Sequence, residues 1–168
     1  MTSMAQQKSV SDRVEKYDVL VIGAGVSGMY ALHHFRDNLG LSVGVFDGAS
    51  GVGGTWWYNR YPGARVDGPG SPFYGYSFSE ELFRDFDWKE TQSEWSEVLA
   101  YLDFVADRLD LRRDIQFNTW VTAAAYAESS QSWTIQTDTG ITATAPFLIC
   151  AGGALSTTNM LDIPGIHD

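Results

Sequence analysis

Three glycines early in the chain have the spacing of a phosphate-binding turn. They fit the pattern Gly23-x-Gly25-x-x-Gly28, directly after a short apolar run and directly before a helical pattern. In such a turn the first glycine allows a tight bend, the second lets the backbone approach a pyrophosphate, and the third lets the helix pack closely on the strand. The following helix N-terminus offers free amides and a positive dipole end to the phosphates. The pattern predicts a dinucleotide site; the alternative is coincidence in a chain with 17 glycines.

An acidic residue follows at the position where such sites contact a ribose. Asp47 ends the second predicted strand, 19 residues after Gly28. A carboxylate at this point accepts hydrogen bonds from the hydroxyls of an adenosine ribose. The same negative charge repels the 2′-phosphate of NADP. The acid therefore favours FAD or NAD over NADP at this site.

A second glycine pair distinguishes between FAD and NAD. Gly53 and Gly54 are followed by Thr55 and Trp56, a few residues after Asp47. The pair lets the chain pass close to a cofactor beyond its pyrophosphate, and the tryptophan supplies a wall for a flat ring system. A permanently bound flavin needs such an element, whereas a nicotinamide dinucleotide does not, so the pattern favours FAD. The alternative is a tight glycine turn followed by a tryptophan of the core.

The elements that must position these residues form a strand–helix–strand unit. Residues 17–22 are a short apolar run typical of a buried parallel strand, and residues 42–47 are a second one. Between them, residues 26–39 carry a helical pattern that Gly40 ends. Residues 48–87 have no periodicity but are rich in glycine, proline and aromatic residues. Irregular segments of this length are usually functional or disordered, and the aromatic content favours an ordered, functional loop.

Regular patterns return in the second half of the chain. Apolar residues recur at helical spacing over residues 95–109, and Thr91 with Glu94 has the spacing of a capping box. Short β-type runs follow at residues 115–117, 120–126, 132–137, 141–144 and 147–151. The predicted fold class is α/β: a Rossmann-like FAD-binding domain whose parallel sheet is flanked by helices and accompanied by a small antiparallel β-meander.

Composition and charge argue against several classes of partner. The chain has 168 residues and a net charge of −10, and so negative a surface repels nucleic-acid phosphates and anionic lipid. No stretch reaches the roughly 18 continuous apolar residues of a membrane-spanning helix. Residues 1–16 lack the apolar centre of a signal peptide and are expected to form a loose polar tail. We therefore expect a cytoplasmic protein that binds neither nucleic acid nor membrane.

The remaining reactive side chains predict no metal site. The single cysteine, Cys150, lies in an apolar run and is expected to be a buried thiol. His33 and His34 are adjacent on the predicted helix and point to different faces, with no cysteine or acid cluster at ligand spacing. The four later tryptophans are expected to be core residues or packing anchors: Trp88, Trp95, Trp120 and Trp133.

The most specific string in the sequence extends the second glycine pair. It reads Gly53-Gly-Thr-Trp-Trp-Tyr-Asn-Arg-Tyr-Pro-Gly-Ala-Arg-Val-Asp67. Together with the glycine turn, it resembles the flavin-dependent Baeyer–Villiger monooxygenases, a branch of the class B flavoprotein monooxygenases. The resemblance covers about residues 17–165. It implies that residues 17–168 are the FAD-binding portion, and that the chain stops before the Phe-x-Gly-x-x-x-His-x-x-x-Trp fingerprint and the NADP-binding domain.

The resemblance implies a reaction and its cofactors. Members of this family bind FAD and reduce it with NADPH. Oxygen then gives a C4a-peroxyflavin, which converts a ketone to an ester or lactone. The partners implied are therefore a small ketone and O2. Two alternatives remain open: a catalytically inactive flavin-binding module, and another class B enzyme that oxygenates nitrogen or sulfur.

The resemblance also implies the site residues. Asp67 is implied near the isoalloxazine as the catalytic carboxylate, paired with an arginine of the NADP domain. The cofactor-binding set implied is Gly23, Gly25, Ser27, Gly28, Asp47, Gly54, Thr55, Trp56, Trp57, Tyr58, Arg65, Asp67, Tyr74 and Val121. One departure follows Asp67, where residues 68–72 replace the acidic and serine step common in the family. The substrate class is therefore not carried over.

Overall fold

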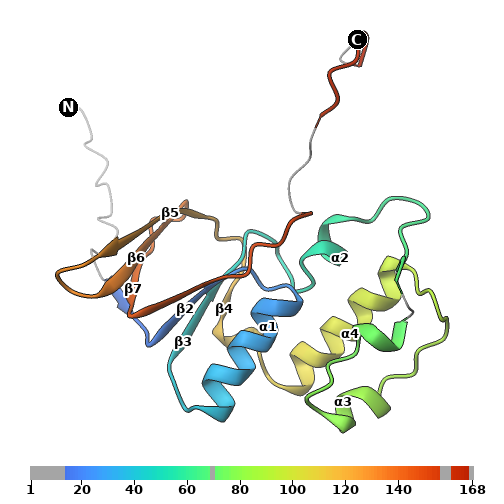
Figure 1. The fold of residues 1–168 in the computed structure, drawn as a ribbon, viewed down its shortest axis with the longest axis horizontal. Helices are drawn as coiled ribbons and strands as arrows, with labels where there is room; N and C mark the ends of the chain where they lie inside the picture. The colour runs from blue at the N-terminus through green and yellow to red at the C-terminus, as the bar shows by residue number, and fades with distance from the viewer. Residues whose placement is uncertain (1–13, 69–70, 156–159, 167–168) are drawn as a thin grey trace, which may run out of the picture.

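The structure is a computed structural model that describes residues 14–68, 71–155 and 160–166. Its centre is a four-stranded sheet (Figure 1). The strand order is β4 (Ile115–Gln116), β3 (Val43–Phe46), β2 (Val19–Ile22) and β8 (Phe147–Cys150). Every pairing in it is parallel. The predicted parallel sheet is confirmed, and each strand lies within two residues of its predicted bounds.

A second sheet contains the predicted meander. Its order is β1 (Val14–Lys16), β7 (Thr142–Ala145), β6 (Ser132–Thr137) and β5 (Val121–Ala127). Strands β5, β6 and β7 are antiparallel, whereas β1 pairs in parallel with β7. The expected tail of residues 1–16 is therefore wrong for its last three residues, which form β1; residues 1–13 lie outside the described part.

Helix α1 (Val26–His33) begins directly at the glycine turn and contacts β2 and β3. It continues as a π-helix, η1 (His34–Asn38), so the predicted helix is confirmed but is not α-helical throughout. Gly40 follows with a φ of +68°, a conformation that glycine adopts without steric cost. The Arg36 side chain anchors this end by donating to the backbone carbonyl oxygens at positions 109 and 110, at 2.7 and 2.9 Å.

The second predicted helix is α4 (Trp95–Arg108), whose apolar stripe packs into the same core as α1. Its start corrects one prediction. Glu94 is the N-cap residue, yet its side chain makes no cap hydrogen bond, so the predicted capping box with Thr91 is wrong. The Glu94 carboxylate instead forms an ion pair with Arg65 at 2.7 Å.

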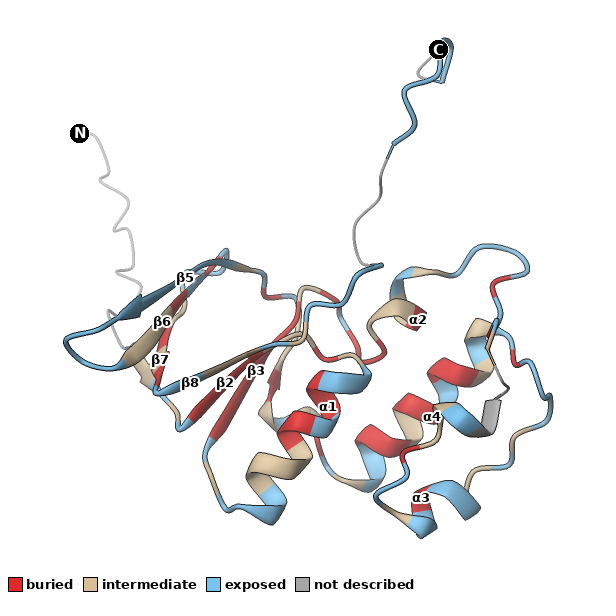
Figure 2. Cartoon of the chain, viewed as in Figure 1, coloured by how far each residue is buried: buried red, intermediate tan, exposed pale blue. Residues whose placement is uncertain are grey.

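The parallel sheet separates two cores because its side chains alternate between its faces. Val19 and Val21 of β2 pack with the helices, whereas Leu20 packs with Phe46 and with Ile135 of the meander. Figure 2 shows the buried residues concentrated in β2 and β3 and on parts of α1 and α4. Packing on both faces of the sheet therefore holds β2 and β3, and with them the residues at their carboxyl ends, in fixed positions.

The remaining helices are short. They are α2 (Thr55–Tyr58), η2 (Ser71–Tyr74), α3 (Glu80–Arg84) and η3 (Arg112–Asp114). Among the described residues, none of the helices has the length and apolar character needed to cross a bilayer. The same residues contain no group of three or more side chains arranged to hold a metal ion.

Candidate functional site

A cleft of about 1050 Å³ opens at the carboxyl ends of β2, β3 and β8. Its walls include the last residues of these strands, Ile22, Phe46 and Cys150. Ligands of open parallel sheets bind at this edge. Most of the predicted binding residues line the cleft: Gly23, Gly25, Ser27, Asp47, Gly54, Thr55, Trp56, Tyr58, Tyr74 and Val121.

The glycine turn is packed so closely that side chains do not fit. Gly23 has a φ of +104°, and a Cβ atom there would lie 2.5 Å from the carbonyl oxygen of Ala151. A Cβ atom at Gly28 would lie 1.8 Å from the carbonyl oxygen of Gly23. Gly28 is therefore buried beneath the turn, where it lets α1 approach β2, and does not line the cleft. The predicted packing reason for the third glycine is confirmed by this geometry.

The second glycine pair lies against the first turn. Gly54 has a φ of +52°, and a Cβ atom on it would lie 2.9 Å from the Cα atom of Gly25. The Gly53 amide donates to the carbonyl oxygen of Ala24 at 3.1 Å. The two glycine segments thus pack backbone against backbone beside the cleft, at a separation that leaves no room for a side chain on Gly54.

Asp47 holds the glycine turn in place. Its carboxylate accepts hydrogen bonds from the Ala24 amide at 2.6 Å and from the Ala49 amide at 2.7 Å, and the residue is only 8% exposed. A carboxylate that accepts two backbone amides fixes their relative position strongly. Asp47 therefore anchors the glycine turn to the end of β3. Its contact with a ribose stays a prediction.

The amino end of α1 makes one part of the cleft suitable for an anion. Gly25 is the N-cap residue, Val26 and Ser27 in the first turn line the cleft, and that turn contains no acidic side chain. The first amides of a helix have no partner within the helix and point outward from its end. They and the helix dipole favour negative charge at this point.

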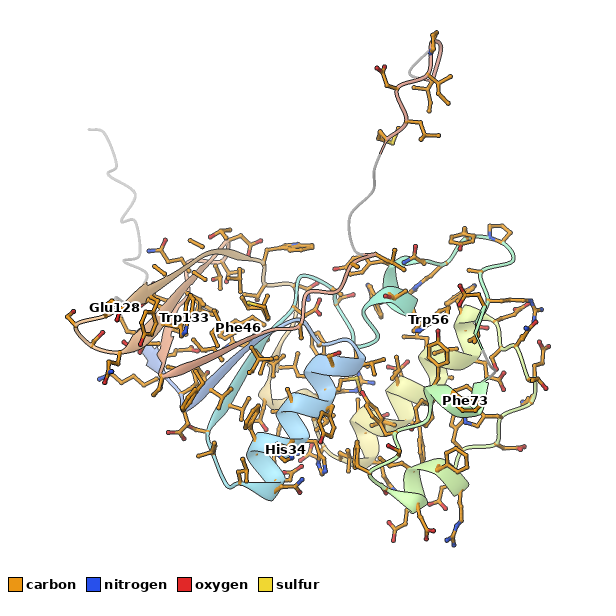
Figure 3. The ribbon with its side chains drawn as sticks, viewed as in Figure 1. His34, Phe46, Trp56, Phe73, Glu128 and Trp133 are labelled. Carbon is orange, nitrogen blue, oxygen red and sulfur yellow. The ribbon has the colours of Figure 1, made fainter. Side chains whose placement is uncertain are left out.

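Aromatic side chains form another wall of the cleft, the aromatic wall, which consists of Trp56, Phe73 and Tyr74. Trp56 of α2 is buried, and its ring meets that of Tyr74 edge to face with the centroids 5.5 Å apart. Phe73 beside it is 74% exposed. Figure 3 shows Trp56 and Phe73 on the same side of the molecule, away from Phe46 on the parallel sheet. The wall presents flat apolar surfaces to the cleft.

Tyr76 connects the aromatic wall to the glycine turn. Its hydroxyl donates to the carbonyl oxygen of Val26 at 2.6 Å, and its own amide donates to the hydroxyl oxygen of Tyr101 at 2.7 Å. Burial raises the pKa of Tyr76. The segment that carries Tyr74 is thus tied to α1 on one side and to α4 on the other.

Replacing Tyr76 with phenylalanine should lower the free energy of unfolding by about 1 kcal/mol, because the bond to the Val26 carbonyl is lost. Urea denaturation measures the change. The matched control is Tyr126→Phe, whose ring is exposed on β5 and which should leave the midpoint unchanged. Equal midpoints for Tyr76→Phe and wild type would show that the hydrogen bond from Tyr76 to Val26 does not stabilise the aromatic wall.

Besides Gly28, three predicted site residues lie outside the cleft. Trp57 packs on Gly51 and under the guanidinium of Arg60, which lies 4.2 Å from the centroid of the tryptophan ring. Arg65 forms ion pairs with the carboxylates of Glu90 and Glu94, in the segment that precedes α4. Asp67 is exposed beside the aromatic wall. The pKa of Tyr74 in that wall is raised, first by burial and second by the negative charge of Asp67.

Other cleft residues were missed by the sequence analysis. Five of them come from the end of β8 and from the segment before β5: Ala151, Gly152, Gly153, Thr119 and Trp120. Others, among them Phe73 and Tyr76, lie in the segment that carries Tyr74. One signal was available, because residues 147–151 run into two glycines just as residues 17–22 run into Gly23.

Two expectations about single side chains are corrected. Cys150 is exposed and not a buried thiol, because β8 is an edge strand. Trp120 is 51% exposed, so its expected role as a packing anchor is also wrong.

Comparisons with known proteins agree with this geometry. Residues 21–87 match the family model described as an NAD(P)-binding Rossmann-like domain. A Baeyer–Villiger monooxygenase of Pseudooceanicola batsensis is 48% identical over 152 residues, which are 90% of this chain and 28% of that protein. The phenazine N-monooxygenase PhzNO1 of Lysobacter antibioticus is 46% identical over 149 residues, 89% of this chain and 27% of that protein.

A solved structure of an oxidized steroid monooxygenase bound to NADP is similar in both sequence and fold. It superposes with a TM-score of 0.85 and 51% identity over 90% of this chain and 29% of that chain. The chain therefore spans less than a third of the length of these relatives. The fold is α/β and Rossmann-like, as predicted. Over the length that it spans, the chain is similar to the Baeyer–Villiger monooxygenases in both sequence and fold.

Proposed function

We propose that the cleft binds FAD and that the chain is the flavin-binding portion of a monooxygenase. The observation that carries this proposal is the continuous backbone surface formed by Gly25 and Gly54 beside the amino end of α1. This surface suits a pyrophosphate, because phosphate oxygens can approach the amides without meeting a side chain. The wall of Trp56 and Tyr74 then suits a flat, largely apolar ring.

The types of residue that line the cleft suit the successive parts of FAD. The glycine turn and the first amides of α1 would hold the pyrophosphate. Asp47, which already fixes the turn, would lie on the ribose side. Trp56 and Tyr74 would orient the ring and exclude water from one of its faces. When bound, FAD supplies the transfer of electrons from NADPH to O2. The chain's own residues bind the cofactor and orient its ring.

We further propose a ketone as the substrate of the whole enzyme, with an ester or lactone as its product. The support is the similarity to the Baeyer–Villiger monooxygenase and to the steroid monooxygenase. In this proposal Asp67, exposed beside Tyr74, is the carboxylate that pairs with a cationic group of the NADP-binding portion. Its exposed position leaves it accessible to such a group.

A second candidate is the oxygenation of a nitrogen atom. The similarity to the phenazine N-monooxygenase, which extends over 89% of this chain, favours it. The flavin cleft is common to both candidates, so this portion alone does not distinguish their substrates. Product analysis with the full-length enzyme, given a ketone and a phenazine in parallel, separates the two.

The FAD proposal has a direct test with the chain itself. After incubation with excess FAD and desalting, we expect the purified chain to retain flavin absorbance and to unfold at a higher temperature than without FAD. A chain that retains no flavin and shows no thermal shift contradicts the proposal. NADPH consumption stimulated by a ketone would exclude the alternative of an inactive flavin-binding module.

A further inference from the structure

The structure assigns a further binding residue to the proposed FAD site: we propose that the indole of Trp120 stacks on the adenine ring. This inference rests on the proposed function. Trp120 belongs to neither of the glycine segments and precedes the meander strand β5. It nevertheless lines the cleft, and 51% of its surface is exposed.

The indole lies directly over Gly48. A Cβ atom on Gly48 would lie 2.1 to 2.5 Å from three atoms of the indole, Cε2, Cδ2 and Nε1. Only a glycine therefore allows the ring this position. Because Gly48 follows Asp47 directly, the ring lies one residue beyond the carboxylate that anchors the glycine turn.

The backbone on both sides of the indole is fixed. The Trp120 amide donates to the carboxylate of Asp138 at 2.9 Å, and the Asp138 amide donates to the carbonyl oxygen of Trp120 at 2.9 Å. The amide of Thr119 donates to the carbonyl oxygen of Asp47 at 2.9 Å. The exposed ring is thus presented from a rigid segment, so that stacking a ligand on it costs little ordering of the chain.

The order of groups along the cleft identifies what meets this ring. The amino end of α1 suits the pyrophosphate, and the acid at the end of the second strand of such a fold lies on the adenosine ribose. In FAD the adenine follows this ribose. A base that continued in the same direction would pass Gly48 and reach Trp120, both of which line the cleft. The flavin would then lie at the other end, beside Trp56 and Tyr74.

Stacking on the indole of Trp120 would distinguish ligands that contain adenine from those that lack it. Every base offers a flat face to an aromatic side chain, so the contact is strong without hydrogen-bond readout. FMN and riboflavin lack the adenine and do not reach the ring. Trp120 should therefore contribute to the affinity for FAD and for ADP, and should make no contribution to the affinity for FMN.

The test measures the dissociation constants of FAD, FMN and ADP for the chain by calorimetry. Trp120→Ala should weaken FAD and ADP binding by at least about fivefold and by similar factors, while FMN binding stays unchanged. Trp120→Phe should restore most of the loss, because phenylalanine keeps a flat ring. The matched control is Tyr126→Ala, which removes an exposed aromatic of the adjoining strand β5 that does not line the cleft.

Each outcome supports or contradicts the inference. FAD affinity that is unchanged in Trp120→Ala overturns it and leaves the proposed function standing. A loss shared equally by FAD and FMN also overturns it, since this would reflect a general disturbance of the cleft. Wild-type chain that binds neither flavin overturns the proposed function, and the stacking role with it.

Discussion

Replacing Gly28 with alanine is expected to destabilise the chain by about 3 kcal/mol or more, although alanine is the better helix former. The added Cβ atom would lie 1.8 Å from the carbonyl oxygen and 2.8 Å from the carbonyl carbon of Gly23. Both atoms belong to the backbone, so α1 must move away from the turn to relieve the overlap. Because a domain of this size is stable by only about 5 to 15 kcal/mol, urea denaturation should show a much lower midpoint.

A second glycine substitution provides the control. Gly68 has no heavy atom within 4 Å of an added Cβ atom and lacks a positive φ, so Gly68→Ala should leave the midpoint nearly unchanged. A midpoint for Gly28→Ala at or above that of wild type would contradict the close packing of α1 on the turn. FAD retention should be lost in Gly28→Ala and kept in Gly68→Ala.

Replacing Asp47 with asparagine is the second large effect, with an expected loss of about 2 kcal/mol in the free energy of unfolding. The carboxylate accepts from the amides of Ala24 and Ala49 with one oxygen each. Asparagine offers one carbonyl oxygen and one NH2 group, so one of the two amides then faces another donor. Chemical denaturation measures the loss, and FAD titration of the same variant should show weaker binding.

The control for the change of charge is Glu128→Gln. Glu128 is exposed at the turn between β5 and β6, at the far end of the meander (Figure 3), and its substitution should leave both stability and FAD binding unchanged. If Asp47→Asn lost FAD binding at unchanged stability, Asp47 would act on the ligand alone and not as an anchor of the turn.

Local patterns predicted the central elements correctly. The βαβ unit, the glycine turn and the strands of the meander depend on periodicity and on turn residues, which are contained in short windows of sequence. The end of the first helix was also predicted, because Gly40 supports a positive φ. The switch from α1 to the π-helix η1 was not predicted. The bonds from Arg36 to the carbonyl oxygens at positions 109 and 110 join distant parts of the chain, so no local pattern predicts them either.

Distant partners account for the other errors. Strand β1 has no pattern of its own and forms because it pairs with β7, more than a hundred residues away. The predicted capping box is wrong because α4 begins at Trp95, so that Glu94 and not Thr91 is its N-cap residue. The carboxylate of Glu94 pairs with Arg65, which is distant in the sequence. Trp56 and Trp57 are adjacent in the sequence, but successive residues of a helix point about 100° apart, so one lines the cleft and the other packs on Gly51.

The central claim is that FAD occupies the cleft in one orientation, and a crystal structure of the chain grown with FAD tests it most directly. We predict pyrophosphate oxygens within about 3.2 Å of the amides of Val26 and Ser27, and the isoalloxazine ring beside Trp56 and Tyr74. FAD bound away from these amides, or with its adenine beside Trp56, would contradict the account.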